Sequence, residues 1–128
     1  MDNQKIASYI DHTLLKAFAT WEQMVALCDE AVKYKTASVC IPPNYIKRVK
    51  DKYGDKLMIA TVIGFPLGYM TTEAKACETE VALKDGADEI DMVINVYESI
   101  GIIHPAFVWG KMMYWSNVCH KFLLIYLI

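Results

Sequence analysis

Three short apolar segments, separated by stretches with helical periodicity, limit the folds that this chain can adopt. The segments start near residues 37, 57 and 89, and the one at 57–63 is almost continuously apolar. A strand of this kind is typical of a parallel sheet that is covered on both faces. Helices between successive strands supply the crossover connections that parallel pairing requires. We therefore predict an α/β fold, either an open doubly wound sheet or part of a (β/α)8 barrel.

The first of these helices has a clear start signal. Thr20 and Gln23 have the spacing of a capping box, which predicts a helix from this point to about Tyr34. Residues at helical spacing then define its apolar face: Met24, Leu27, Cys28 and Ala31.

Two further helices are predicted from the same kinds of signal. One covers 44–53 and ends at Gly54, because glycine commonly closes a helix. The other starts at Thr71 or Thr72 and ends at Gly86. The helical spacing of its apolar residues predicts a buried face made of Ala74, Cys77 and Val81.

The composition changes abruptly after Asn95. The chain holds 13 basic and 15 acidic residues, but only Glu98, Lys111 and Lys121 of these lie in 96–128. The same segment has no capping signal and no clear amphipathic period. Strand could form at 100–103 and 107–109, and strand or helix at 118–128. We therefore divide the chain into a globular part, 1–95, and a divergent hydrophobic tail, 96–128.

Charge and cysteine usage exclude several classes of protein. The formal net charge of −2 gives no electrostatic case for nucleic acid. The longest apolar run, 122–128, is about a third of the length that a membrane span needs. The four cysteines have no metal-ligand spacing, and no signal-peptide pattern opens the chain. We expect a cytoplasmic protein without a metal or other cofactor.

Asp91 is the most conspicuous polar residue in a predicted strand. Side chains alternate between the faces of a strand, so Ile90 and Met92 share one face and Asp91 lies on the other. In a barrel, polar groups near the carboxyl ends of strands are often catalytic. A structural carboxylate, hydrogen-bonded near the strand end, fits the same pattern.

Two other positions are weaker candidates. The polar trio Asp11-His12-Thr13 is more typical of a turn and cap than of a site element. Cys40 ends the segment at 37–41, and we interpret it as a buried, inert thiol, because nothing near it in the sequence lowers its pKa.

Four segments of the chain form a set of motifs in a fixed order: 9–16 (YIDHTLLK), 37–43 (ASVCIPP), 61–68 (TVIGFPLG) and 86–95 (GADEIDMVIN). Together they resemble the bacterial deoxyribose-phosphate aldolases. In order, they cover the family's opening motif, what we identify as its first strand, its second strand with the following loop, and its third strand. The resemblance covers residues 5–95.

This resemblance implies a (β/α)8 barrel and a metal-free class I aldolase. Such an enzyme cleaves 2-deoxy-D-ribose 5-phosphate into acetaldehyde and D-glyceraldehyde 3-phosphate, in deoxyribonucleotide catabolism. A lysine forms a Schiff base with the substrate, and an aspartate and a second lysine move protons. Asp91 matches the aspartate, whereas Asp11 and Cys40 match positions that line the substrate pocket. The resemblance implies a phosphosugar substrate, and it is compatible with an oligomeric assembly.

The departures from the family are as informative as the matches. The Schiff-base lysine belongs to the family's sixth strand, the second lysine to its seventh and the phosphate site to the last loops. No segment of this chain resembles them, and neither Lys111 nor Lys121 lies in a family motif. We therefore expect an incomplete barrel of about three N-terminal βα units followed by an unassigned tail, which we attribute to a frameshift or truncation. We also expect marginal stability and no aldolase activity.

Two alternatives remain open. The barrel fragment could serve as a non-catalytic α/β binding or interaction module, which would require cooperative folding. Another Schiff-base aldolase of similar barrel type would share the mechanism but not this set of motifs.

Overall fold

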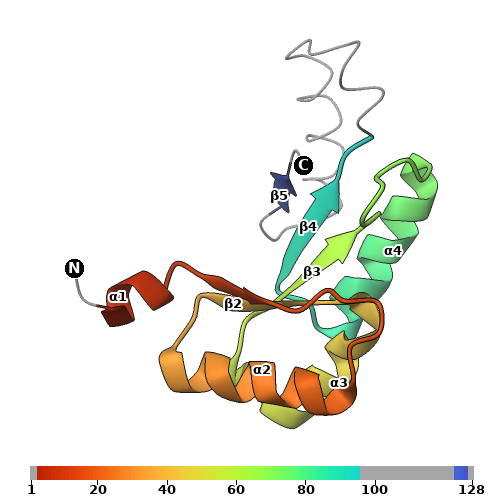
Figure 1. The fold of residues 1–128 in the computed structure, drawn as a ribbon. Coiled ribbons are helices and arrows are strands. Elements are labelled where there is room, and N and C mark those ends of the chain that lie inside the picture. Colours follow the sequence, from red (N-terminus) through yellow and green to blue (C-terminus); the bar gives the residue numbers. More distant parts are fainter. Residues whose placement is uncertain (1–2, 96–122, 127–128) are drawn as a thin grey trace.

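A computed structural model describes residues 3–95 and 123–126 of the chain (Figure 1). The helices are α1 (Asn3–Ala7), α2 (Trp21–Tyr34), α3 (Ile46–Tyr53) and α4 (Thr72–Asp85), with 3-10 turns η1 (Pro43–Tyr45) and η2 (Gly54–Lys56) around α3. The strands are β1 (Asp11–Thr13), β2 (Ser38–Ile41), β3 (Ile59–Ile63), β4 (Glu89–Val93) and β5 (Leu123–Tyr126).

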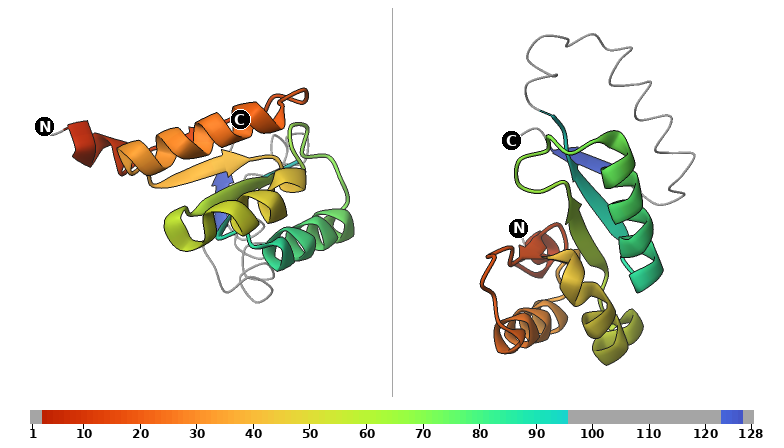
Figure 2. Two further views of the ribbon diagram at one scale, coloured as in Figure 1. Left: turned by 90° about the horizontal axis from the view of Figure 1, so that it is seen from below. Right: turned by 90° about the vertical axis from the view of Figure 1, so that its right-hand side faces the viewer.

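The described strands form one parallel sheet in the order β1-β2-β3-β4-β5. Helices α2, α3 and α4 connect the first four strands in turn, and Figure 2 shows how they surround one side of the sheet. The predicted alternation is therefore confirmed as three βα units followed by β4. Strands β2 and β3 are buried along their whole length, as the apolar run at 57–63 predicts.

The reading of Asp11-His12-Thr13 as a turn and cap is wrong, because these residues form strand β1. They pair in parallel with β2, Asp11 opposite Ser38 and Thr13 opposite Cys40. Three residues are too few to show a strand period in the sequence. Because β1 precedes it, β2 is the second strand of the sheet and not the first, and the segment at 89–93 is the fourth.

Helix α2 forms as predicted. The Thr20 side chain accepts a hydrogen bond from the Gln23 N–H, and the Gln23 side chain accepts one from the Thr20 N–H. The four residues predicted for its apolar face are all buried. Helix α3 likewise buries Ile46, Val49 and Tyr53 and ends at Gly54.

Helix α4 has the predicted bounds but the opposite buried face. Thr71 caps its start and Gly86 closes it. Its buried residues are Lys75, Thr79 and Ala82, whereas Cys77 and Val81 are exposed. The predicted apolar face of Ala74, Cys77 and Val81 is therefore wrong. The first residue of the buried face is a lysine, so the apolar pattern of the sequence predicted the wrong face of the helix.

The core lies mainly between the sheet and the helices. Alternate strand residues, among them Val39, Ile59 and Ile90, pack with the buried faces of α2 and α3 in one large cluster. A smaller cluster of Cys40, Ala60 and Val62 lies apart from it. We call the sheet face that carries this smaller cluster the inner face. Among the described helices, none is long and apolar enough to cross a bilayer.

One part of the tail is described. Residues Leu123–Tyr126 form β5, parallel to β4, so the strand alternative is confirmed for this part of 118–128. The strands predicted at 100–103 and 107–109 lie outside the described residues.

Adjacent substitutions in α4 test which face is buried. We expect Ala82→Asp to lower the free energy of unfolding by about 3 kcal/mol, because it places a carboxylate in the core. Val81→Asp should cost only about 0.5 kcal/mol, because Val81 is 53% exposed. Urea unfolding followed by circular dichroism measures both. The reverse order of effects would restore the face predicted from the apolar pattern.

Candidate active site

Strand alternation gathers polar side chains on the inner face of the sheet. On β2, Val39 and Ile41 pack in the large cluster, so Ser38 and Cys40 lie on the opposite face. On β4, Ile90 and Met92 pack with the helices, which leaves Asp91 on the inner face as predicted.

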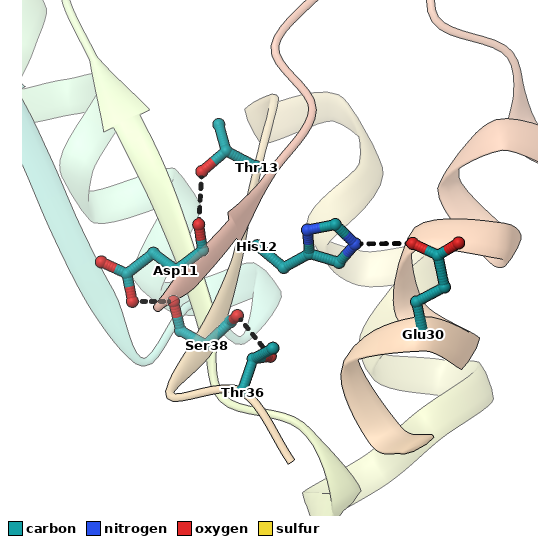
Figure 3. A network of polar contacts seen from close by, with 6 residues as sticks. All are labelled: Asp11, His12, Thr13, Glu30, Thr36 and Ser38. Carbon is teal, nitrogen blue, oxygen red and sulfur yellow. Dashed lines mark hydrogen bonds and ion pairs between the residues drawn. The ribbon is translucent and has the colours of Figure 1, made fainter. Parts of the chain in front are cut away.

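The beginning of β1 is tied to β2 through side chains (Figure 3). The Ser38 hydroxyl donates to Asp11 Oδ1 at 2.7 Å. His12 points the other way, toward α2, and its Nε2 lies 2.8 Å from Glu30 Oε2. Strand β1, which was not predicted from the sequence, therefore places Asp11 at the site and directs His12 away from it.

Cys40 and Asp91 meet across β3. The Cys40 thiol donates to Asp91 Oδ2 at a sulfur–oxygen distance of 3.7 Å. The small side chain of Ala60, the β3 neighbour of Cys40 in the sheet register, lies in the same cluster as Cys40. Sheet register thus brings together two residues that are 51 positions apart in the sequence.

A cavity of about 360 Å³ opens beside this pair. Its volume lies within the range of small-molecule sites. The described residues that line it include Asp11, Thr13, Cys40, Val62, Phe65 and Asp91. All three positions singled out from the sequence, Asp11, Cys40 and Asp91, therefore border one cavity. Their catalytic or binding roles stay predictions.

Burial raises the pKa of the Asp91 carboxyl above its ordinary value. The hydrogen bond from Cys40 opposes this shift, and the Asp11 carboxylate adds to it. Burial also raises the pKa of Glu89, with further contributions from Asp11, Asp91 and Asp88. Among the described residues, the charged groups that raise the pKa of Asp91 and Glu89 are thus all acidic side chains. Protonated Asp91 is therefore favoured more than in water, which suits a group that exchanges protons with a substrate.

The Cys40 thiol is held in its neutral form. Burial, together with the Asp91 carboxylate, raises its pKa to about 12. The expectation of a buried thiol is confirmed by its 4% exposure. The neutral thiol can therefore donate its hydrogen bond to Asp91.

The described residues offer no metal centre. Within 3–95 and 123–126, no three His, Cys, Asp or Glu side chains are arranged to hold a metal ion.

Two residues beside the candidate site were not predicted from the sequence. Ser38 orients Asp11, and its alternation with Cys40 along β2 is the signal that could have identified it. Lys75 is the other: it lies on α4, and its ammonium donates to the backbone at the end of β4. An isolated lysine in a helix gives no sequence signal for such a contact.

Comparison with known proteins identifies the family. A sequence model described as "DeoC/LacD family aldolase" matches residues 5–100. The chain belongs to this family. A deoxyribose-phosphate aldolase from Clostridium botulinum (strain Alaska E43 / Type E3) is 57% identical over 96 residues, which are 75% of this chain and 43% of that protein. The corresponding protein from Streptococcus pyogenes (serotype M4) is 52% identical over 96 residues, with the same coverage.

Solved structures confirm the fold. The tetrameric deoxyribose-phosphate aldolase from Aeropyrum pernix superposes with a TM-score of 0.82 and 26% identity, covering 97% of this chain and 53% of that one. This chain therefore spans about half the length of the relatives that it matches. The expectation of an incomplete aldolase barrel is confirmed.

The raised pKa of Asp91 predicts a specific pH dependence of stability. Folding favours the protonated form, so the stabilisation is greatest below the unfolded pKa and is lost as the pH rises through the raised folded value. Asp91→Asn should therefore leave stability near pH 3 unchanged and raise it at pH 7 by about 0.5 kcal/mol, since the group is partly solvated. Urea unfolding at both pH values measures the difference. Lower stability of the variant at pH 7 would contradict the prediction.

Differences in cysteine reactivity provide a second test. Cys40, with a pKa of about 12, and Cys28, with a pKa of about 11, hold little thiolate at pH 8, whereas Cys77 is exposed. We expect iodoacetamide to modify Cys77 at least about 100-fold faster than either buried thiol. Peptide mass mapping over time gives the rates. Equal rates at Cys40 and Cys77 would show that the cavity thiol is activated.

Proposed function

We propose that this chain provides the proton-transfer half of a Schiff-base aldolase site for 2-deoxy-D-ribose 5-phosphate. One observation carries the proposal: the Asp91 carboxylate faces the cavity, touches Cys40 and has a raised pKa. Asp91 also occupies the position of the family's proton-relay aspartate in the segment 86–95. A carboxyl group with a pKa nearer neutrality can both donate and accept a proton during turnover.

The proposed mechanism assigns Asp91 to the proton transfers and not to bond cleavage itself. A lysine amine attacks the substrate aldehyde to form a carbinolamine, and loss of water gives a protonated imine. The substrate hydroxyl beside the breaking carbon–carbon bond loses its proton to water, the imine accepts the electrons of that bond, and glyceraldehyde 3-phosphate departs, which leaves an enamine. Asp91, with water, moves protons at the carbinolamine and enamine steps. The proposed class I mechanism uses no metal.

Asp11 is a supporting residue in this proposal. Its Oδ1 is fixed by the Ser38 hydroxyl, and the residue lines the cavity together with Asp91. An ordered carboxylate can accept hydrogen bonds from the hydroxyl groups of a sugar. Cys40 supports the site by its contact with Asp91. The phosphosugar substrate, an oligomeric assembly, a cytoplasmic location and a role in deoxyribonucleotide catabolism belong to the same proposal.

The 128-residue chain by itself should lack aldolase activity. No lysine of the chain lies in a segment that resembles the family's Schiff-base motif. The purified chain should therefore release no acetaldehyde from the substrate, and borohydride should trap no protein–substrate adduct. Turnover that is lost on Asp91→Asn would show that another lysine of this chain forms the Schiff base.

A chimaera tests the role of Asp91 directly. Residues 1–95 are joined to the remaining sequence of the 57%-identical Clostridium botulinum aldolase. We expect acetaldehyde release and a borohydride-trapped adduct from this chimaera. Asp91→Asn should lower kcat/KM by about 100-fold or more, because it removes a general acid–base group.

Glu89→Gln is the matched control for this variant. Glu89 lies on the same strand and also has a raised pKa, but it is not among the described residues that line the cavity. Its replacement should leave kcat/KM within a few-fold of the parent chimaera. Equal losses of kcat/KM in the two variants would show that Asp91 contributes to catalysis no more than its neighbour Glu89 does.

A further inference from the structure

Lys75 is a charged side chain buried against the sheet. It is 7% exposed and lies on the buried face of α4 with Thr79 and Ala82. Enclosing an ammonium group is costly unless its donors find acceptors. A methionine or leucine would cover the same area at lower cost, so packing alone does not explain a lysine here.

The Lys75 ammonium joins two backbone segments beside the cavity. It donates to the Gly68 carbonyl oxygen at 2.5 Å and to the Val93 carbonyl oxygen at 2.7 Å. Gly68 belongs to the loop between β3 and α4, and Val93 is the last residue of β4, two positions after Asp91. Bonds from a charged donor are stronger than those between neutral groups.

The loop is shaped to fit around this ammonium. Gly64 and Gly68 both have positive φ angles, and the Gly68 N–H donates to the Gly64 carbonyl oxygen at 2.8 Å. A Cβ at Gly64 would lie 2.8 Å from Lys75 Cε, and a Cβ at Gly68 would overlap the Ile94 carbonyl oxygen. Because these two glycines have no Cβ, the loop can approach both Lys75 and the end of β4.

We propose that Lys75 is a positioning residue that fixes the carboxyl end of β4 and the loop at 64–68 in their places around the cavity. Through Val93 it sets the backbone that carries Asp91, and through Gly68 it holds the loop whose Phe65 lines the cavity wall. The inference rests on the proposed function only in assuming that the placement of Asp91 serves proton transfer. Lys75 itself takes no part in bond making.

Lys75→Met tests the proposal, because methionine is similarly long and fills the space without a charge. The variant should unfold at a similar urea concentration to the parent chain. The Gly68 amide should exchange with solvent about tenfold or more faster, because its loop has lost charge-assisted bonds. The carboxyl pKa of Asp91, measured by carbon-13 chemical shift, should rise further as the Cys40 contact loosens.

Lys84→Met is the matched control, since Lys84 is an exposed residue in the last turn of the same helix. It should alter neither the Gly68 exchange rate nor the titration of Asp91. Wild-type values of both quantities in Lys75→Met would overturn the proposal. These measurements do not depend on aldolase turnover, so an inactive chimaera would refute the proposed function and leave this result intact.

The wild-type chain answers the question even if Lys75→Met fails to fold. The Lys75 ammonium should give a nitrogen-15 signal with slow hydrogen exchange and scalar couplings to the Gly68 and Val93 carbonyl carbons. A fast-exchanging ammonium without these couplings would show that it does not hold the two segments together.

Discussion

The two-residue alternation of side chains along parallel strands is the constraint on which both the core and the candidate site depend. Hydrogen-bond register fixes Val39 and Ile90 toward the helices, and the same register turns Cys40 and Asp91 toward the cavity. A slip of one residue in β4 would bury a carboxylate among apolar side chains and expose Ile90. The hydrophobic effect therefore positions the polar site, because the core accepts only one register.

The site itself opposes folding, so its stability must come from elsewhere. Desolvation raises the pKa of Asp91 at the cavity and of Glu89 outside the cavity lining, which means that their ionised forms are less favourable here than in water. The large cluster between the sheet and the helices provides the compensating burial. Partly desolvated carboxylates that persist at such an energetic cost are commonly found where proton transfer occurs.

The sequence predicted those features that depend on local pattern. The capping box of α2, the fully buried β3 and the inward side of Asp91 each follow from spacing over a few residues. Strand β1 escaped prediction because it is defined only by backbone pairing with β2. The buried face of α4 was misplaced because Lys75 lies in the interior only when the Gly68 and Val93 carbonyls are there to receive it. Both failures concern contacts that a local sequence pattern does not contain, between β1 and β2 and between Lys75 and the backbone of the loop and of β4.

The charges on the inner face fit the proton-transfer part of the proposed mechanism. Among the described residues, the charges that raise the pKa of Asp91 and Glu89 are carboxylates, and they make the ionisation of these two acids less favourable. A Schiff-base mechanism places a protonated imine in such a site, and this cation would relieve that repulsion. In the proposed mechanism the imine accepts the electrons of the breaking carbon–carbon bond, whereas acids and water move protons. Under the proposed function, the inner face would therefore stabilise and protonate an intermediate that forms on a lysine outside the matched motifs.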